Sequence, residues 1–166
     1  MISTYINSIR QAITEKNGYC ALALALALPD ICGSIEHPSE QSSKKRFVDW
    51  YDQYIAPKFH EVFSEGVGDL LLSGADCYAL RCSFLHNGSE IIASQRAQKV
   101  LEKFYFVQPL ENWSFNTRTR ETMLIVQVDR FCHLVCNSVD SWMSGRVISD
   151  RQFLKIYNPK IDGIPL

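Results

Sequence analysis

An arginine and a histidine stand five positions apart in the segment Ala79–Gly88, near the end of a predicted helix. Arg81 has a permanently charged, forked guanidinium group that suits phosphate oxygens. His86 can accept or donate a proton near neutral pH, because the unperturbed pKa of imidazole lies there. Together the two side chains have the chemistry to bind and cleave a phosphodiester. An isolated Arg-x4-His pair is more often structural, with the arginine bound to a carboxylate and the histidine to helix-end carbonyls.

A helix through this segment separates Arg81 and His86 by roughly 140° around its axis and by about 7.5 Å along it. The sequence Asn87-Gly88 predicts the helix end, because both residues tolerate the left-handed conformation of a C-terminal cap. Between the pair runs an apolar stripe that we expect to face the core, formed by Leu71, Ala75, Tyr78, Cys82 and Leu85. A second stripe on the opposite face comprises Cys77, Leu80 and Phe84. A helix that is apolar on two faces needs a packing partner on each of them, so the second stripe predicts a homodimer contact.

At these residues the sequence resembles the HEPN superfamily, whose hallmark is an arginine, four to six residues, and then a histidine near the end of a long helix. The resemblance implies an up-and-down helical bundle that dimerises. It also implies, as in many members, metal-independent ribonuclease activity in toxin–antitoxin and defence systems. Carried over to this chain, it assigns Arg81 and His86 to the active centre and adds Asn87 as a candidate beside them. Cys82 departs from the family pattern, because catalytic members often have a polar Asn, Asp or His directly after the arginine.

We therefore expect a metal-independent RNA endonuclease of toxin or defence type. His86 would take the proton from an RNA 2′-hydroxyl or protonate the leaving oxygen, while Arg81 would stabilise the charge that grows on the phosphate. Two symmetry-related pairs near a dimer axis would supply acid and base together. The alternative is a non-catalytic HEPN-like module that binds RNA, a nucleotide or a protein partner such as an antitoxin, and Cys82 favours it. A third hypothesis, a purely structural helical protein, gains if Arg81 lies in a buried intramolecular salt bridge.

The length and charge of the chain are compatible with these expectations. With 166 residues, 46% of them hydrophobic, the chain is expected to form one domain, 1–166, around a single core. A net charge of −1 argues against a surface that coats nucleic acid, yet residues 81–166 carry 11 basic and 8 acidic groups. Any RNA contact should therefore lie in this half. Candidate phosphate contacts there are Arg96, Lys99, Lys103, Arg118 and Arg120.

The six cysteines do not predict disulfides or a metal site. Most of them stand in apolar helical contexts, which is typical of reduced core thiols. Cys132, His133 and Cys136 lack the Cys-x2-Cys spacing and the second half of a zinc site. Cys82 and His86 could be a nucleophile and its base, but we expect Cys82 to face the core. Since no glycine-rich phosphate-binding motif occurs either, we expect no cofactor and no metal.

The elements that position the motif are mainly helical. We expect helices at about 2–16, 19–28 with an extension to 32, 44–63, 68–86 and 130–145, and a small β-hairpin of 103–107 and 123–128. The apolar run Cys20–Leu28 lacks β-branched residues and is too short to span a bilayer, so we interpret it as a buried helix. No export signal is evident, which favours a cytoplasmic protein without a membrane segment. The fold class expected is thus mainly α, an up-and-down helical bundle with a small β-hairpin.

Overall fold

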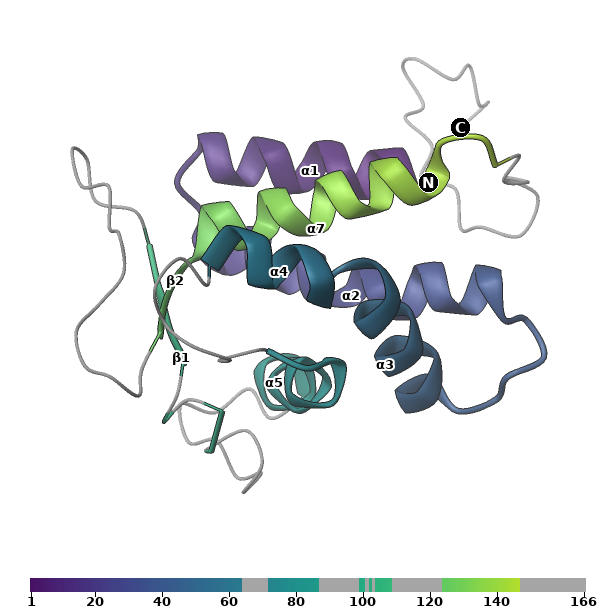
Figure 1. The fold of residues 1–166 in the computed structure, drawn as a ribbon. Coiled ribbons are helices and arrows are strands. Elements are labelled where there is room, and N and C mark those ends of the chain that lie inside the picture. The colour runs from purple at the N-terminus through teal and green to yellow at the C-terminus, as the bar shows by residue number, and fades with distance from the viewer. Residues whose placement is uncertain (64–71, 87–98, 101, 103, 109–123, 147–166) are drawn as a thin grey trace, which may run out of the picture.

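The computed structural model describes residues 1–63, 72–86, 99–100, 102, 104–108 and 124–146. Helices form a bundle, and a two-stranded sheet lies at one end of it (Figure 1). The described helices are α1 (Ile2–Thr14), α2 (Gly18–Glu36), α3 (Ser43–Tyr54), α4 (Ala56–Phe63), α5 (Gly74–His86) and α7 (Val128–Met143). The strands are β1 (Phe104–Val107) and β2 (Leu124–Gln127). The prediction of a mainly α helical bundle is confirmed.

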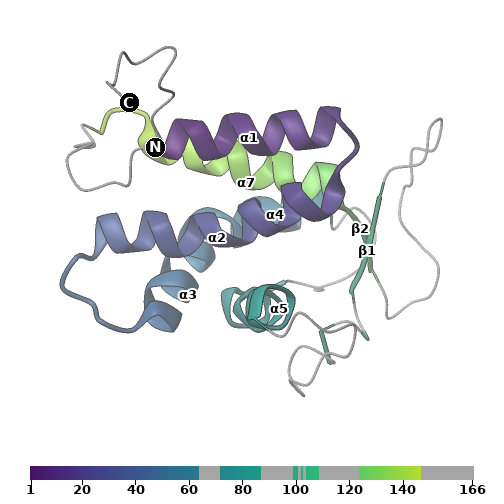
Figure 2. The ribbon, with the colours of Figure 1, turned by 180° about the vertical axis from the view of Figure 1, so that it is seen from behind.

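The apolar helix α2 occupies the centre of the bundle. It packs against α1 and α7 on one side and against α3 and α5 on the other (Figure 2). Its alanines and leucines favour a helix, and the Asn17 side chain caps it by accepting a hydrogen bond from the Cys20 N–H at 3.1 Å. Within the described chain, α2 is the one helix whose length and apolar composition would also suit a membrane span. The prediction of a buried helix is confirmed by Ala21, Ala25 and Leu28, which are fully buried.

Aromatic and aliphatic side chains at helical spacing fill the core, as predicted. Helix α3 contributes Phe47, Trp50 and Tyr51, and α7 contributes Phe131, Leu134, Val135, Val139 and Trp142. The predicted helix 44–63 is interrupted, because α3 ends at Tyr54 and α4 begins at Ala56. Pro57 explains the break, since proline lacks the N–H that a continuous helix would need and fits the first turn of a new one.

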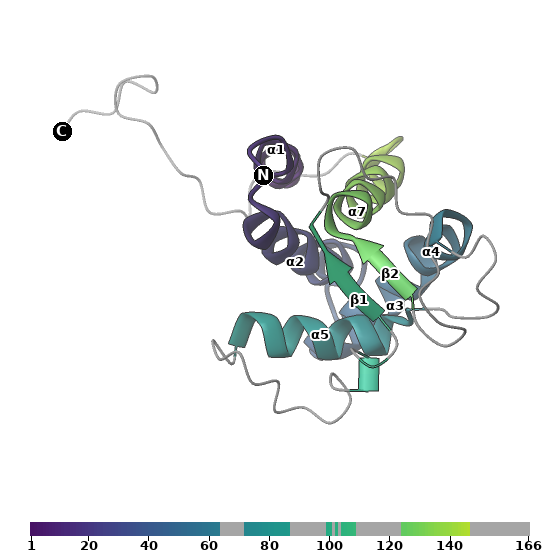
Figure 3. The same ribbon diagram turned by 90° about the vertical axis from the view of Figure 1, so that its left-hand side faces the viewer.

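The two predicted strands exist, but they do not form a hairpin. Strands β1 and β2 run parallel, with Phe104 paired to Leu124 and Val107 to Gln127, and lie side by side across the end of the bundle (Figure 3). A tight hairpin turn can join only antiparallel strands, whereas parallel strands need a crossover of about a dozen residues or more. The segment 109–123 between the strands is long enough for such a crossover, and it lies outside the described residues.

The two predicted apolar stripes of α5 are placed only partly as expected, because Tyr78 of the first stripe and Phe84 of the second both pack, partly buried, against the core. Cys77 and Leu80, expected at a dimer contact, are 1% and 7% exposed because they pack within the chain against the core. Leu85, expected in the core stripe, is 37% exposed, and Tyr78 and Cys82 are half-buried. The second stripe therefore gives no reason to expect a dimer through this face. Leu71, the start of the predicted motif helix and the C-terminal segment 147–166 lie outside the described residues.

Candidate functional site

Arg81 lies on the side of α5 that faces α2 and α3. Its Nη2 is 3.4 Å from Oδ2 of Asp30 in α2. The guanidinium carbon is 5.9 Å from the centre of the Phe47 ring and 5.6 Å from that of Tyr78. Such cation–π contacts help to hold a guanidinium in place, in addition to its ion pair. The side chain is only 14% exposed, so Arg81 is held within the bundle by an intramolecular salt bridge, which is the arrangement that favours the hypothesis of a structural arginine.

The carboxylate of Asp30 is shared among three donors. Besides Arg81, it contacts Arg46 of α3, whose Nη2 is 3.4 Å from Oδ1, and it accepts a hydrogen bond of 2.9 Å from the Ser43 hydroxyl. We call Asp30, Ser43, Arg46 and Arg81 the Asp30 cluster. Arg46 also donates from Nη1 to the Glu40 carbonyl oxygen at 2.6 Å. The cluster joins three helices at the point where α3 and α5 pack on α2.

The local sequence explains how Arg46 reaches Asp30. Gly33 is one helical turn after Asp30 and lies against the α3 backbone. A Cβ atom at Gly33 would come within 2.5 Å of the Arg46 carbonyl oxygen, which is closer than real Cβ contacts. Glycine at this position therefore permits the close approach of α2 and α3. That approach brings the Arg46 guanidinium to the same carboxylate as Arg81.

The charges of the Asp30 cluster do not balance. Two guanidinium groups share one carboxylate, which leaves one surplus positive charge at side chains that are 14–20% exposed. Among the described residues, neither the Arg46 Nε nor the Arg81 Nε has a hydrogen-bond partner, although both atoms are buried. Buried donors without partners are costly. The arrangement therefore suits an additional anion.

A second polar cluster, at the C-terminal end of α2, provides a contrast. Glu36 accepts hydrogen bonds from the Tyr54 hydroxyl and the Trp142 indole, each at 2.8 Å, and from the Arg146 guanidinium at 3.1 Å. One carboxylate here faces one guanidinium, so the charges balance. The cluster connects α2, α3 and the end of α7. Its role is structural, and it has no surplus charge for a ligand.

Tyr78 and Cys82 lie beside Arg81 on the partly exposed face of α5. The Tyr78 ring meets the Phe47 ring edge-on at 5.4 Å. Burial raises the pKa of Tyr78, a hydrogen bond to Cys82 raises it further, and Arg81 opposes these effects. Tyr78 therefore remains a protonated hydrogen-bond donor at neutral pH. The expectation that Cys82 faces the core is wrong, since it is half-buried beside Tyr78.

The structure places only part of the predicted active centre. The backbone of His86 ends α5, as the sequence predicted, but the His86 side chain and the whole of Asn87 lie outside the described residues. The pairing of Arg81 with His86 therefore stays a prediction. Of the candidate phosphate contacts, Lys99 is exposed, and Arg96, Lys103, Arg118 and Arg120 lie outside the described residues.

Sequence reasoning missed Asp30, Ser43 and Arg46. The signal that could have found Asp30 is a lone acidic residue directly after Pro29, in the middle of a helix that is otherwise apolar. A charged side chain at such a position is rarely left without an opposite charge. Its partners could not be read from the sequence, because they depend on how α3 and α5 cross α2.

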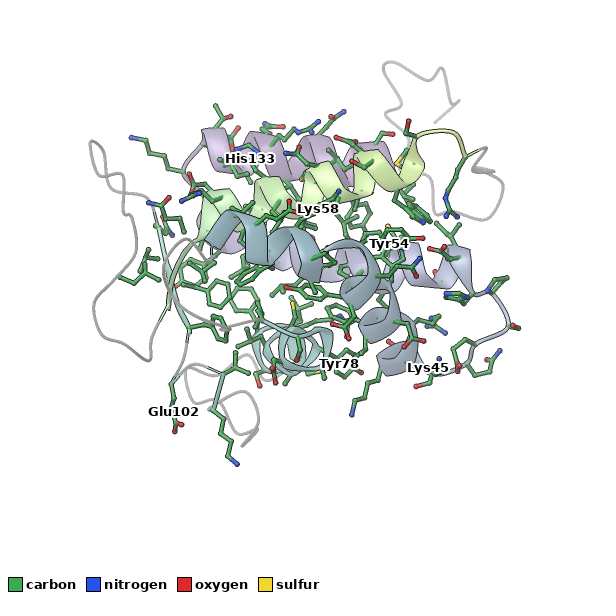
Figure 4. The ribbon with its side chains drawn as sticks, in the orientation of Figure 1. Lys45, Tyr54, Lys58, Tyr78, Glu102 and His133 are labelled. Carbon is green, nitrogen blue, oxygen red and sulfur yellow. The ribbon has the colours of Figure 1, made fainter. Side chains whose placement is uncertain are left out.

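The cysteines are free thiols, as expected. Cys132 and Cys136 are buried in α7, whereas His133 between them is exposed on the outer face of the same helix (Figure 4). Cys132 and Cys136 therefore share the buried face of α7, and His133 points away from them. Across the described residues, no group of three His, Cys, Asp or Glu side chains is arranged to hold a metal ion.

Comparison with protein-family models, with curated proteins and with solved structures finds no match to this chain.

Proposed function

We propose that this chain is a HEPN-like helical module that binds RNA through phosphate contacts at the Asp30 cluster, without cleaving it. The observation that carries the proposal is that Arg46 and Arg81 share the single carboxylate of Asp30. The surplus positive charge of the two guanidinium groups gives an RNA phosphate a favourable position beside the cluster.

The two ion pairs of the cluster are long. Both guanidinium–carboxylate distances are 3.4 Å, whereas charge-assisted hydrogen bonds are typically about 2.7–2.9 Å long. The two arginines are therefore oriented by Asp30 without having used their full hydrogen-bonding capacity. Because Phe47 and Tyr78 hold the Arg81 guanidinium in place, little side-chain entropy remains to be lost when a phosphate binds.

One sequence feature favours a binding role over a catalytic one. Cys82, which follows Arg81, differs from the polar residue of catalytic HEPN members. The partners of such a module would be RNA and, as in the family that the motif resembles, a second copy or an antitoxin.

The second candidate is the metal-independent endonuclease. One observation favours it: His86 ends the helix that carries Arg81, as the family motif requires. In that case Asp30 orients Arg81 toward the phosphate, and His86 acts as the acid or base.

RNA binding tests the proposal directly. Fluorescence anisotropy with a labelled single-stranded RNA should show binding by the wild-type protein that weakens as salt rises. Arg46→Ala and Arg81→Ala should each weaken it by roughly 10-fold, the equivalent of about 1.4 kcal/mol. Arg10→Ala is the matched control, because Arg10 is 43% exposed on α1 and pairs with Asp140. If the wild-type protein does not bind RNA, or if all three variants behave alike, the proposal is wrong.

Cleavage separates the two candidates. RNA incubated with the protein in excess EDTA should stay intact if the chain is a binding module. Fragments with cyclic phosphate ends, produced by the wild-type protein and not by His86→Ala, would instead establish the endonuclease. Fragments that form only when magnesium is restored would exclude the metal-independent mechanism.

A further inference from the structure

A tyrosine at the start of α2 is almost fully open to solvent. Tyr19 is 73% exposed, and its ring lies parallel to the ring of Phe84 on α5, with centroids 6.2 Å apart and an angle of 8° between the planes. Phe84 itself is partly buried against the core. The Tyr19 ring is thus fixed by a stacked partner, while most of its surface stays in contact with water.

The surroundings of this ring set it apart from the rest of the surface. Tyr19 and Leu85 are the two exposed large apolar side chains of the described residues; the Tyr19 ring stacks on Phe84, and Leu85 follows Phe84 in α5. Phe84 stands in the last turn of α5, which ends at His86. The open aromatic surface therefore lies beside the motif turn. Since so little of Tyr19 is buried, its contribution to folding is small.

We propose that the Tyr19 ring is a stacking platform for a base of single-stranded RNA. This inference rests on the proposed RNA-binding function and names the kind of RNA. Aromatic side chains bind the faces of unpaired bases, and each such stack contributes enough that its removal weakens binding roughly 10-fold. Bases in a duplex have their faces covered by their neighbours, so a duplex could not use this platform.

The position of the platform relative to the Asp30 cluster supports an extended strand. Arg81 contacts α2 at Asp30, and Phe84 contacts α2 at Tyr19, so both lie where α5 packs on α2 (Figure 3). At 1.5 Å per residue, Asp30 and Tyr19 are about 16 Å apart along α2, whereas Arg81 and Phe84 are neighbours one turn apart on α5. A flexible strand can place a phosphate at the cluster and a base on the ring.

A protein partner fits the same surface less well. Specific protein interfaces bury roughly 800 Å² per partner, and in the part of the chain that the structure describes only Tyr19 and Leu85 are large apolar side chains exposed to solvent. An apolar protein contact would also accept any apolar side chain of similar size, whereas base stacking requires a π-face. This difference provides the test.

The experiment compares Tyr19→Leu with Tyr19→Phe in the full-length chain. Leucine keeps the apolar character and loses the π-face, while phenylalanine keeps the ring and loses the hydroxyl. Anisotropy with a single-stranded RNA should show a loss of roughly 10-fold for Tyr19→Leu and wild-type affinity for Tyr19→Phe. Circular dichroism should show that both variants are folded. RNA containing 5-iodouridine should photocrosslink to the peptide that holds Tyr19 in the wild-type protein.

The outcomes distinguish this inference from the function on which it rests. Unchanged affinity of Tyr19→Leu, with the wild-type protein still binding RNA, would overturn the platform alone. Equal losses in both variants would also overturn it, because the hydroxyl rather than the ring would then matter. If the wild-type protein binds no RNA, the platform and the proposed function are both wrong.

Discussion

At the scale of single residues, Asp30 is the side chain on which the candidate site depends. It is 20% exposed and faces two guanidinium groups and the Ser43 hydroxyl. Removing one member of such a partly buried ionic cluster costs more than the pair contributes, because charges without partners remain. The Asp30 carboxylate therefore both orients the arginines and competes with any phosphate for them.

We predict that Asp30→Asn lowers the free energy of unfolding by about 1–3 kcal/mol. Its two arginines would then repel each other without a counter-charge. Thermal denaturation measures the effect. Asp140→Asn is the control, since Asp140 pairs with Arg10 on the surface, where both side chains are more than 40% exposed, and surface pairs contribute about 0–1 kcal/mol.

Inorganic phosphate provides a second measurement on the same variant. If the Asp30 cluster has a position for a phosphate, millimolar phosphate should raise the melting temperature of Asp30→Asn more than that of Asp140→Asn. Equal responses of the two variants would contradict an anion site at the cluster.

The sequence alone identified Arg81 but not its role. The guanidinium and the spacing to His86 are visible in the chain, so the motif could be recognised. What Arg81 contacts depends on Asp30, 51 residues earlier, and on Arg46 in a third helix. Contacts between residues so far apart in the chain leave no periodic pattern, which is why Asp30, Ser43 and Arg46 could not be predicted as neighbours of Arg81.

At the scale of elements, α5 shows how a correct helix can be assigned the wrong buried face. Both of its stripes are apolar, so periodicity predicts a helix without indicating which stripe packs inward. The structure places Cys77 and Leu80 inside, against the core, and leaves Leu85 exposed. The two strands show the same limitation, because their composition predicts β-structure while the direction of pairing depends on the connection.

A matched pair of substitutions tests the orientation of α5. We predict that Leu80→Asp, at a position 7% exposed, costs more than about 3 kcal/mol or prevents folding, because it buries a charge without a partner. Leu85→Asp, at a position 37% exposed, should stay within about 1 kcal/mol of the wild-type protein. Urea denaturation followed by circular dichroism compares them. If Leu85→Asp destabilised the protein more than Leu80→Asp, the buried face of α5 would be the one that the sequence predicted.

At the scale of the whole molecule, the buried thiols make stability depend on alkaline pH. Burial raises the pKa of Cys132 to about 12 and that of Cys136 to about 11, and it raises the pKa values of Cys32 and Cys77 as well. In the unfolded chain a cysteine thiol has a pKa of about 8.5. Above that pH the unfolded state releases protons that the folded state keeps, so folding becomes less favourable.

We predict that the contribution of the buried thiols to stability is constant below about pH 8.5 and falls as the pH rises toward the folded-state pKa values. Cys132 alone should contribute a loss of about 1.4 kcal/mol per pH unit within that range. Urea denaturation between pH 7 and 10.5, with a reducing agent present, measures the slope. Cys132→Ala should have a shallower slope than the wild-type protein. Identical slopes would mean that the Cys132 thiol is not protected from ionisation in the folded chain.

The central position of α2 also has a consequence for the order in which the chain is made. This most apolar helix ends at Glu36, yet one of its main packing partners, α7, begins only at Val128. At about 5–20 residues per second, a ribosome takes several seconds to complete the intervening segment. During that interval α7 does not yet exist, so the side of α2 that will pack against α7 lacks this packing partner. The nascent chain is therefore expected to need a chaperone or a transient contact until its last helix emerges.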